Sequence, residues 1–111
     1  MRKHTEEEIE VFVKDYMWKL WKRYFPEKAK FRANAIKRLK IFMNNHPDVT
    51  LEDVREAIEY YIRVTPRKYI RYPNYFIYKH GVKNISNAIS TLEEVLEELK
   101  DRNDNVKMNI E

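Results

Sequence analysis

A segment of interleaved basic and aromatic residues runs from Tyr60 to His80. Six of the eight tyrosines lie in it, and residues 60–92 contain six basic residues and no acidic residue. Cationic side chains bind the phosphates of single-stranded nucleic acid, and flat rings stack on its bases. The segment therefore predicts DNA binding, most of all to single strands. The residues of this segment that we expect to take part are Arg63, Arg67, Lys68, Tyr69, Arg71, Tyr72, Tyr75 and Lys79.

The same rings could instead belong to a hydrophobic core. A tyrosine can bury its ring while its hydroxyl stays at the rim. We expect roughly half of the rings to be structural on this ground. The best candidates for burial are Tyr61, Tyr69, Phe76 and Ile77.

A second cationic region precedes this segment. Residues 14–40 contain ten basic and two acidic residues. Lys30, Lys37 and Lys40 fall on one side of a predicted helix, opposite its apolar residues. Lysines on a helix often form only a solvated face, but this imbalance favours a surface that binds polyanions. We add these three lysines to the predicted nucleic-acid site.

Catalysis has little support in the sequence. His4, His46 and His80 lie near a terminus, in a turn and near a helix end, and none has a partner at metal-ligand spacing. The glutamates between residues 93 and 98 read as a solvated helix face. The chain has no cysteine and only one glycine, which excludes thiolate chemistry and glycine-rich phosphate loops. We expect no enzyme active site, no metal and no cofactor.

Helical periodicity accounts for almost the whole chain. Apolar residues at three- and four-residue spacing predict helices over 6–24, about 27–44, 50–64 and about 82–101, with a short helix over 73–79 between the last two. No segment alternates with a period of two. The sequence therefore predicts an all-α fold, a single compact bundle of four to five helices.

Capping signals set the expected helix boundaries. Thr5 and Thr50 each precede an acidic residue by three positions, which is the pattern of a capping box. Thr91 and Glu94 could form another, so the last helix could break near Ser90. We expect one helical domain over residues 1–102 and a polar, frayed tail over 103–111.

Composition limits the class of protein. The chain has 111 residues, which is one ordinary domain, and charged residues make up 36% of it. Its apolar runs are too short for a membrane span. We expect a protein of the host cell cytoplasm with no membrane partner. The many charged residues and the lack of cysteine would also suit a thermophile.

Four features in order resemble a known family. A tryptophan-rich helix comes first, and a helix with Arg32, Ile36 and Leu39 follows it. Then come a T-x-x-D-V-x-x-A-I stretch at residues 50–58 and K-Y-I-R-Y-P-N-Y-F at residues 68–76. Over about residues 10–80 this order resembles the C-terminal helical modules of phage and prophage replication-initiation proteins, including the DnaD-like replisome organisers. In those modules the tyrosine–proline–aromatic signature usually ends in a longer tail with a tryptophan or Phe-glutamate anchor, whereas here Lys79, His80 and Gly81 lead into a further predicted helix.

The resemblance implies a role in starting the replication of a phage, virus or plasmid. In that role the protein would bind single-stranded DNA or contact the replicative helicase and its loader. One alternative is a non-catalytic adaptor, in which the first helix and the aromatic segment dock a helicase, loader or primase or form a homodimer. Another is an auxiliary domain of a primase, because the helix-bundle domains associated with primases have similar size and charge.

Overall fold

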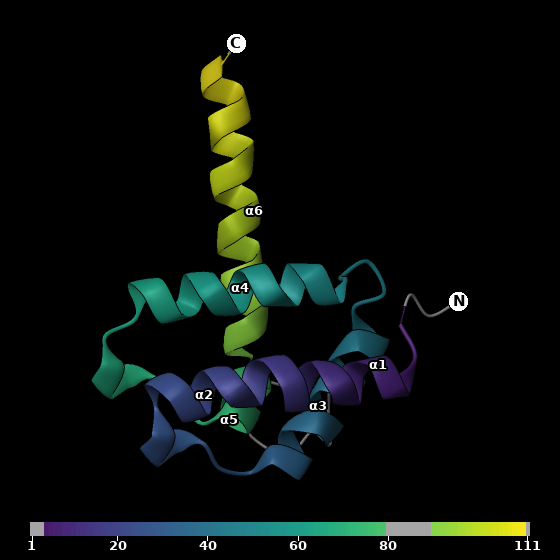
Figure 1. Ribbon diagram of the computed structural model, residues 1–111. Coiled ribbons are helices and arrows are strands. Elements are labelled where there is room, and N and C mark those ends of the chain that lie inside the picture. Colours follow the sequence, from purple (N-terminus) through teal and green to yellow (C-terminus); the bar gives the residue numbers. More distant parts are fainter. Residues whose placement is uncertain (1–3, 80–89, 111) are drawn as a thin grey trace.

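The computed structural model describes residues 4–79 and 90–110, with side chains described over 4–79 and 90–102. These residues contain helices and turns and no strand, which confirms the predicted all-α bundle (Figure 1). The elements in order are α1 (Glu6–Val11), the π-helix η1 (Phe12–Met17), α2 (Trp18–Tyr24), the 3₁₀ turn η2 (Pro26–Lys28), α3 (Arg32–Asn45), α4 (Leu51–Val64), the 3₁₀ turn η3 (Arg67–Tyr69), α5 (Pro73–Ile77) and α6 (Thr91–Ile110).

The helix predicted over residues 6–24 is present as one rod of α1, η1 and α2. It begins at the predicted capping box of Thr5 and Glu8. Its core-facing residues follow one another at intervals of four: Ile9, Val13, Met17 and Trp21. In an α-helix each four-residue step overshoots the 3.6-residue turn by about 40°. The wider π turn in the middle of the rod reduces that drift, so all four side chains reach the same core.

The second predicted helix begins later than expected. The prediction of a start at about Glu27 is wrong, because α3 begins at Arg32. Pro26 starts the short turn η2, and Phe31 then adopts the left-handed conformation with φ of 65°. A positive φ is incompatible with a right-handed helix, so the chain turns before α3 can start.

α4 forms as the sequence predicts. Thr50 Oγ1 accepts a hydrogen bond from the Asp53 amide at 3.1 Å, and the Asp53 carboxylate accepts one from the Thr50 amide at 2.9 Å. The helix ends at Val64, two residues before Pro66. The Tyr16 hydroxyl donates to the Glu59 carboxylate at 3.2 Å and ties the first rod to α4.

The last two helices pack against each other, and α5 also packs against α3. α5 begins at Pro73 as expected but ends at Ile77 rather than at Lys79. The predicted helix over 82–89 and its preceding glycine lie outside the described residues. α6 begins at Thr91, and Ser90 rather than Thr91 caps it, because the Glu93 amide donates to Ser90 Oγ at 3.1 Å.

α6 crosses α4 and projects well beyond the other helices (Figure 1). The sequence predicts a frayed tail from residue 103, whereas α6 continues to Ile110. No proline or glycine lies between Thr91 and Ile110 to interrupt the helix. No helix among the described residues is long and apolar enough to cross a membrane.

Buried aromatic rings link the elements at the centre of the bundle. Trp21 of α2 and Phe76 of α5 have ring centroids 6.0 Å apart, and Tyr61 of α4 lies 4.6 Å from Phe76. Phe42 of α3 lies 5.8 Å from Tyr78. These contacts hold the short helix α5 against three longer elements.

Candidate nucleic-acid interface

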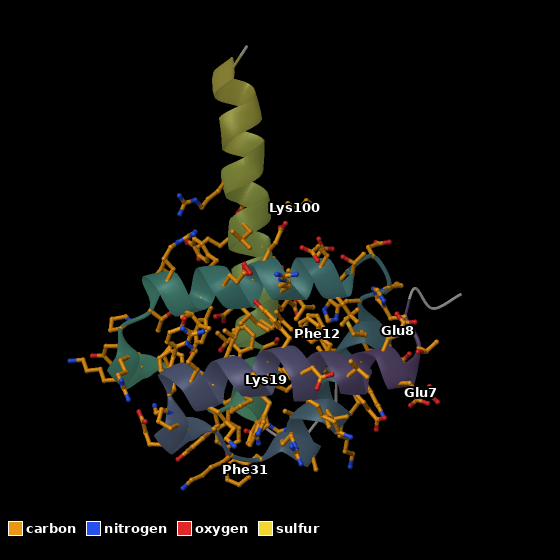
Figure 2. The ribbon with its side chains drawn as sticks, in the orientation of Figure 1. Glu7, Glu8, Phe12, Lys19, Phe31 and Lys100 are labelled. Carbon is orange, nitrogen blue, oxygen red and sulfur yellow. The ribbon has the colours of Figure 1, made fainter. Side chains whose placement is uncertain are left out.

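Three aromatic rings meet at the surface where the turn before α3 faces α5. The ring centroid of Phe31 lies 5.3 Å from that of Tyr72 and 6.4 Å from that of Tyr75, and those of Tyr72 and Tyr75 are 5.8 Å apart. Phe31 is 51% exposed and Tyr75 37%, while Tyr72 is half-buried. We call Phe31, Tyr72 and Tyr75 the exposed aromatic cluster. Figure 2 shows Phe31 at the edge of the body away from Lys100 of α6.

The backbone brings these rings together from two separate turns. Phe31 immediately precedes α3, and Tyr72 immediately precedes Pro73 at the start of α5. Proline favours an extended residue before it, and Tyr72 has φ of −57° and ψ of 150°. Tyr75 lies one turn further along α5. The two tyrosine rings therefore project from one short helix towards the turn that carries Phe31.

Hydrogen bonds from α3 fix α5 in this position. The Asn74 side-chain amide donates to Asn34 Oδ1 at 2.9 Å. Arg38 Nη1 donates to the Asn74 carbonyl at 3.3 Å and also to the Tyr78 carbonyl. Its guanidinium lies 5.6 Å from the centre of the Tyr75 ring, and burial lowers the pKa of Arg38. Arg38 thus holds both the backbone of α5 and one ring of the cluster.

Phe31 is the only non-glycine residue with positive φ among the described residues. For an L-residue with a Cβ the left-handed conformation costs about 1–2 kcal/mol. Its ring is half-exposed, so burial returns only part of the usual hydrophobic gain. An exposed aromatic side chain held in a strained backbone is a feature that folding alone does not favour, and such strain concentrates at functional sites.

The backbone before Tyr72 is also held in place. Trp21 Nε1 donates to the Arg71 carbonyl at 2.9 Å. The Arg71 amide donates to the Tyr61 hydroxyl at 2.9 Å, and Lys28 Nζ donates to the Ile70 carbonyl. Burial raises the pKa of Tyr61. The Arg71 side chain itself is exposed, and it follows this anchored backbone one residue before Tyr72.

The cluster adjoins cations and no carboxylate of its own elements. Lys30 and Arg71 are exposed and adjacent in sequence to Phe31 and Tyr72. α3 contains no acidic residue, and residues 65–79 contain none. Lys37 is exposed on α3 next to Arg38. The surface therefore combines rings with positive charge.

Three other predicted residues form the 3₁₀ turn η3, and two of them contact a neighbouring side chain. Arg67 Nη2 lies 3.1 Å from a Glu27 carboxylate oxygen, and both residues are exposed. A hydrogen bond from its own backbone amide and the guanidinium of Arg67 lower the pKa of Glu27. Lys68 lies 5.1 Å from the ring centre of Tyr69. Tyr69 is 62% exposed, so the expectation that it is buried is wrong, because η3 turns its ring towards solvent.

Two predicted residues do not join the cluster. Lys40 pairs with Glu10 of α1 at 3.2 Å. Arg63 lies at the end of α4, 5.6 Å from the ring centre of Tyr60, where Arg102 of α6 also approaches at 5.4 Å. Helical spacing alone could not show that Lys40 would pair with α1 or that Arg63 and Arg102 of α6 would approach the same ring.

Lys79, the last predicted residue, is exposed just after α5. The six tyrosines of the basic-aromatic segment divide equally. Three are buried, Tyr60, Tyr61 and Tyr78, and three are exposed or half-buried, Tyr69, Tyr72 and Tyr75.

Sequence reasoning missed two residues of the surface, Phe31 and Arg38. The signal for Phe31 was present, because it stands between Lys30 and Arg32 in the same basic-aromatic pattern. Placing residues 27–44 in one helix concealed it. Arg38 has no signal in the sequence, because its contacts lie 36 and 40 residues away.

No group of three His, Asp or Glu side chains within residues 4–79 and 90–102 could hold a metal ion. Comparison with known proteins gives no significant match to a family model, to a curated protein or to a solved structure.

Proposed function

We propose that this chain binds single-stranded DNA, through the exposed aromatic cluster and the cations Lys30 and Arg71 beside it. The observation that carries the proposal is Phe31, a half-exposed ring in a strained left-handed conformation that packs on two further surface rings. Rings of this kind stack on unpaired bases, and each stacked base contributes about 1–3 kcal/mol.

Charge supports the same conclusion. A nucleic-acid backbone approaching the cluster meets Lys30, Arg71 and Lys37, and meets no carboxylate from α3 or from residues 65–79. Single strands are favoured over duplex because duplex bases are already stacked on each other and cannot reach surface rings. A role in phage, virus or plasmid replication initiation rests on the family resemblance and forms part of the proposal.

A titration of single-stranded and duplex DNA tests the proposal. A labelled oligothymidylate of about 15 nucleotides and a duplex of equal length are titrated at about 50 and 200 mM salt. We expect tighter binding of the single strand and an affinity that falls steeply with salt. Equal affinity for both forms would remove the stacking role, and affinity independent of salt would remove the phosphate contacts.

Matched variants locate the binding surface. Arg71→Ala should weaken binding and reduce the salt slope by about one contact, whereas Arg63→Ala, outside the cluster, should change neither. Tyr75→Leu should weaken single-strand binding by about 1–3 kcal/mol with little change in the salt slope. If Tyr75→Leu lowers only the melting temperature, the ring is structural and the stacking role fails.

A further inference from the structure

A groove of about 530 Å³ lies on another part of the molecule, between the start of α4, the turn before it and the first turns of α6. It does not include any residue of the exposed aromatic cluster. In Figure 2, Lys100, which lines it, lies above α4, whereas Phe31 lies at the bottom of the view. Its volume falls within the usual range for ligand pockets, about 300–1,000 Å³.

The groove has an apolar component. Val49, Leu96 and Leu99 line it, and each is only partly buried although each packs against the core. Partly buried leucines on two successive turns of α6 offer contact surface to apolar side chains from outside. Filling the groove would bury this surface further.

Its rim is acidic. Five carboxylates line the groove against one lysine and one histidine. Glu56 of α4 and Glu97 of α6 are exposed, and neither forms a hydrogen bond or ion pair with another described residue. Glu93 lies 3.3 Å from His46 Nε2. A polyanion would be repelled here, whereas cationic side chains could reach several carboxylates at once.

We propose that this groove docks a basic amphipathic helix of a partner protein. Leucine-like side chains on one face of that helix would contact Leu96, Leu99 and Val49, and its Lys and Arg residues would pair with Glu56 and Glu97. An added strand would need a free sheet edge, and the described residues contain no strand. Two helices lining an apolar groove favour the helix-in-groove mode, with anchors at three- and four-residue spacing.

The test uses a labelled peptide of about 14 residues made of leucine and lysine, with leucines at three- and four-residue spacing so that one face is apolar. Fluorescence anisotropy with the full chain should show saturable binding. A second peptide, with its leucines replaced by glutamine, should bind at least about tenfold more weakly, because it lacks the apolar anchors. Equal binding of both peptides would mean that charge alone attracts them and would overturn the proposal.

Matched variants of the chain locate the contact. Glu56→Gln with Glu97→Gln should weaken peptide binding at least about fivefold. Glu7→Gln with Asp15→Asn removes the same charge from exposed positions outside the groove and should leave the affinity unchanged. If both pairs weaken binding equally, the groove is not the docking site. Circular dichroism at 222 nm checks that each variant is folded.

Two further outcomes would assign the groove to another occupant. If the chain self-associates in sedimentation equilibrium and Glu56→Gln with Glu97→Gln abolishes this, a second copy fills the groove and the partner proposal fails. Tyr75→Leu, in the exposed aromatic cluster, should leave peptide affinity unchanged, because the groove contains no residue of the cluster. If Tyr75→Leu weakens peptide binding as much as Glu56→Gln with Glu97→Gln, the peptide binds the cluster surface and the proposal fails, whether or not the proposed DNA binding itself holds.

Discussion

At the scale of single residues, Phe31 has the backbone conformation that folding stability explains least. Its left-handed backbone is disfavoured for any side chain with a Cβ, and glycine would remove that cost. Among the aromatic residues that the structure describes, the ring contacts only Tyr72 and Tyr75, and both lie at the surface. Phenylalanine at this position is therefore explained better by what the ring binds than by what it contributes to folding.

Two substitutions at Phe31 separate strain from function. Phe31→Ala removes the ring and keeps the strain, whereas Phe31→Gly removes both. We expect both variants to lose the same single-strand affinity, and Phe31→Gly to be more stable than Phe31→Ala by about 1 kcal/mol in urea unfolding. Unchanged DNA affinity in both variants would exclude Phe31 from the site.

Tyr16 provides a residue-level prediction about pH. Burial, and then the nearby charge of Glu59, raise its pKa to about 12 from an ordinary value of 10. The folded state therefore holds a proton that the unfolded chain loses above pH 10. This contribution to stability is complete below pH 10 and is lost as the pH rises towards 12.

Urea unfolding at a series of alkaline pH values measures this contribution. The free energy of unfolding of the native chain should fall more steeply above pH 10 than that of Tyr16→Phe, which has no phenol to titrate at this position. Parallel pH profiles for the two proteins would show that Tyr16 has no raised pKa.

Helices with strong caps were predictable from the sequence at the scale of elements. Thr50 and Asp53 form reciprocal hydrogen bonds at the start of α4, so their spacing alone locates that start. The turn before α3 was not predictable in this way, since the rings that Phe31 contacts belong to residues 41 and 44 positions later. The π-helix η1 had a signal in the sequence, because its core residues recur every four positions without a break. This spacing also fits the three- and four-residue pattern of an ordinary α-helix, so it does not by itself indicate a π-helix.

The start of α6 gives a matched test of capping. Ser90 Oγ accepts the Glu93 amide, so Ser90→Ala should lower the free energy of unfolding by about 1 kcal/mol. Thr91→Ala, one residue later and inside the helix, should change it by much less. Thermal unfolding of both variants checks the register. A larger loss at Thr91 would restore the boundary suggested by the sequence.

The whole molecule separates two kinds of surface. Rings and cations lie around the turn before α3 and the start of α5, while carboxylates and leucines line the groove between α4 and α6. The net charge of +4 conceals this separation. The candidate site was only partly predictable from the sequence. Arg63 and Arg71 belong to one basic segment, but Arg63 lies on α4, which ends at Val64, and Arg71 lies beyond that helix. Lys40 is similarly removed from the site by its pair with Glu10.

The most direct measurement of the central claim is a nuclear magnetic resonance titration of the full chain with oligothymidylate. Ring and amide signals of Phe31, Tyr72 and Tyr75, and the amide of Arg71, should shift in proportion to bound DNA. Signals of Leu96 and Glu97 in the groove should stay in place. Shifts confined to the groove or to α1, or no shifts at low salt, would contradict the proposed nucleic-acid interface.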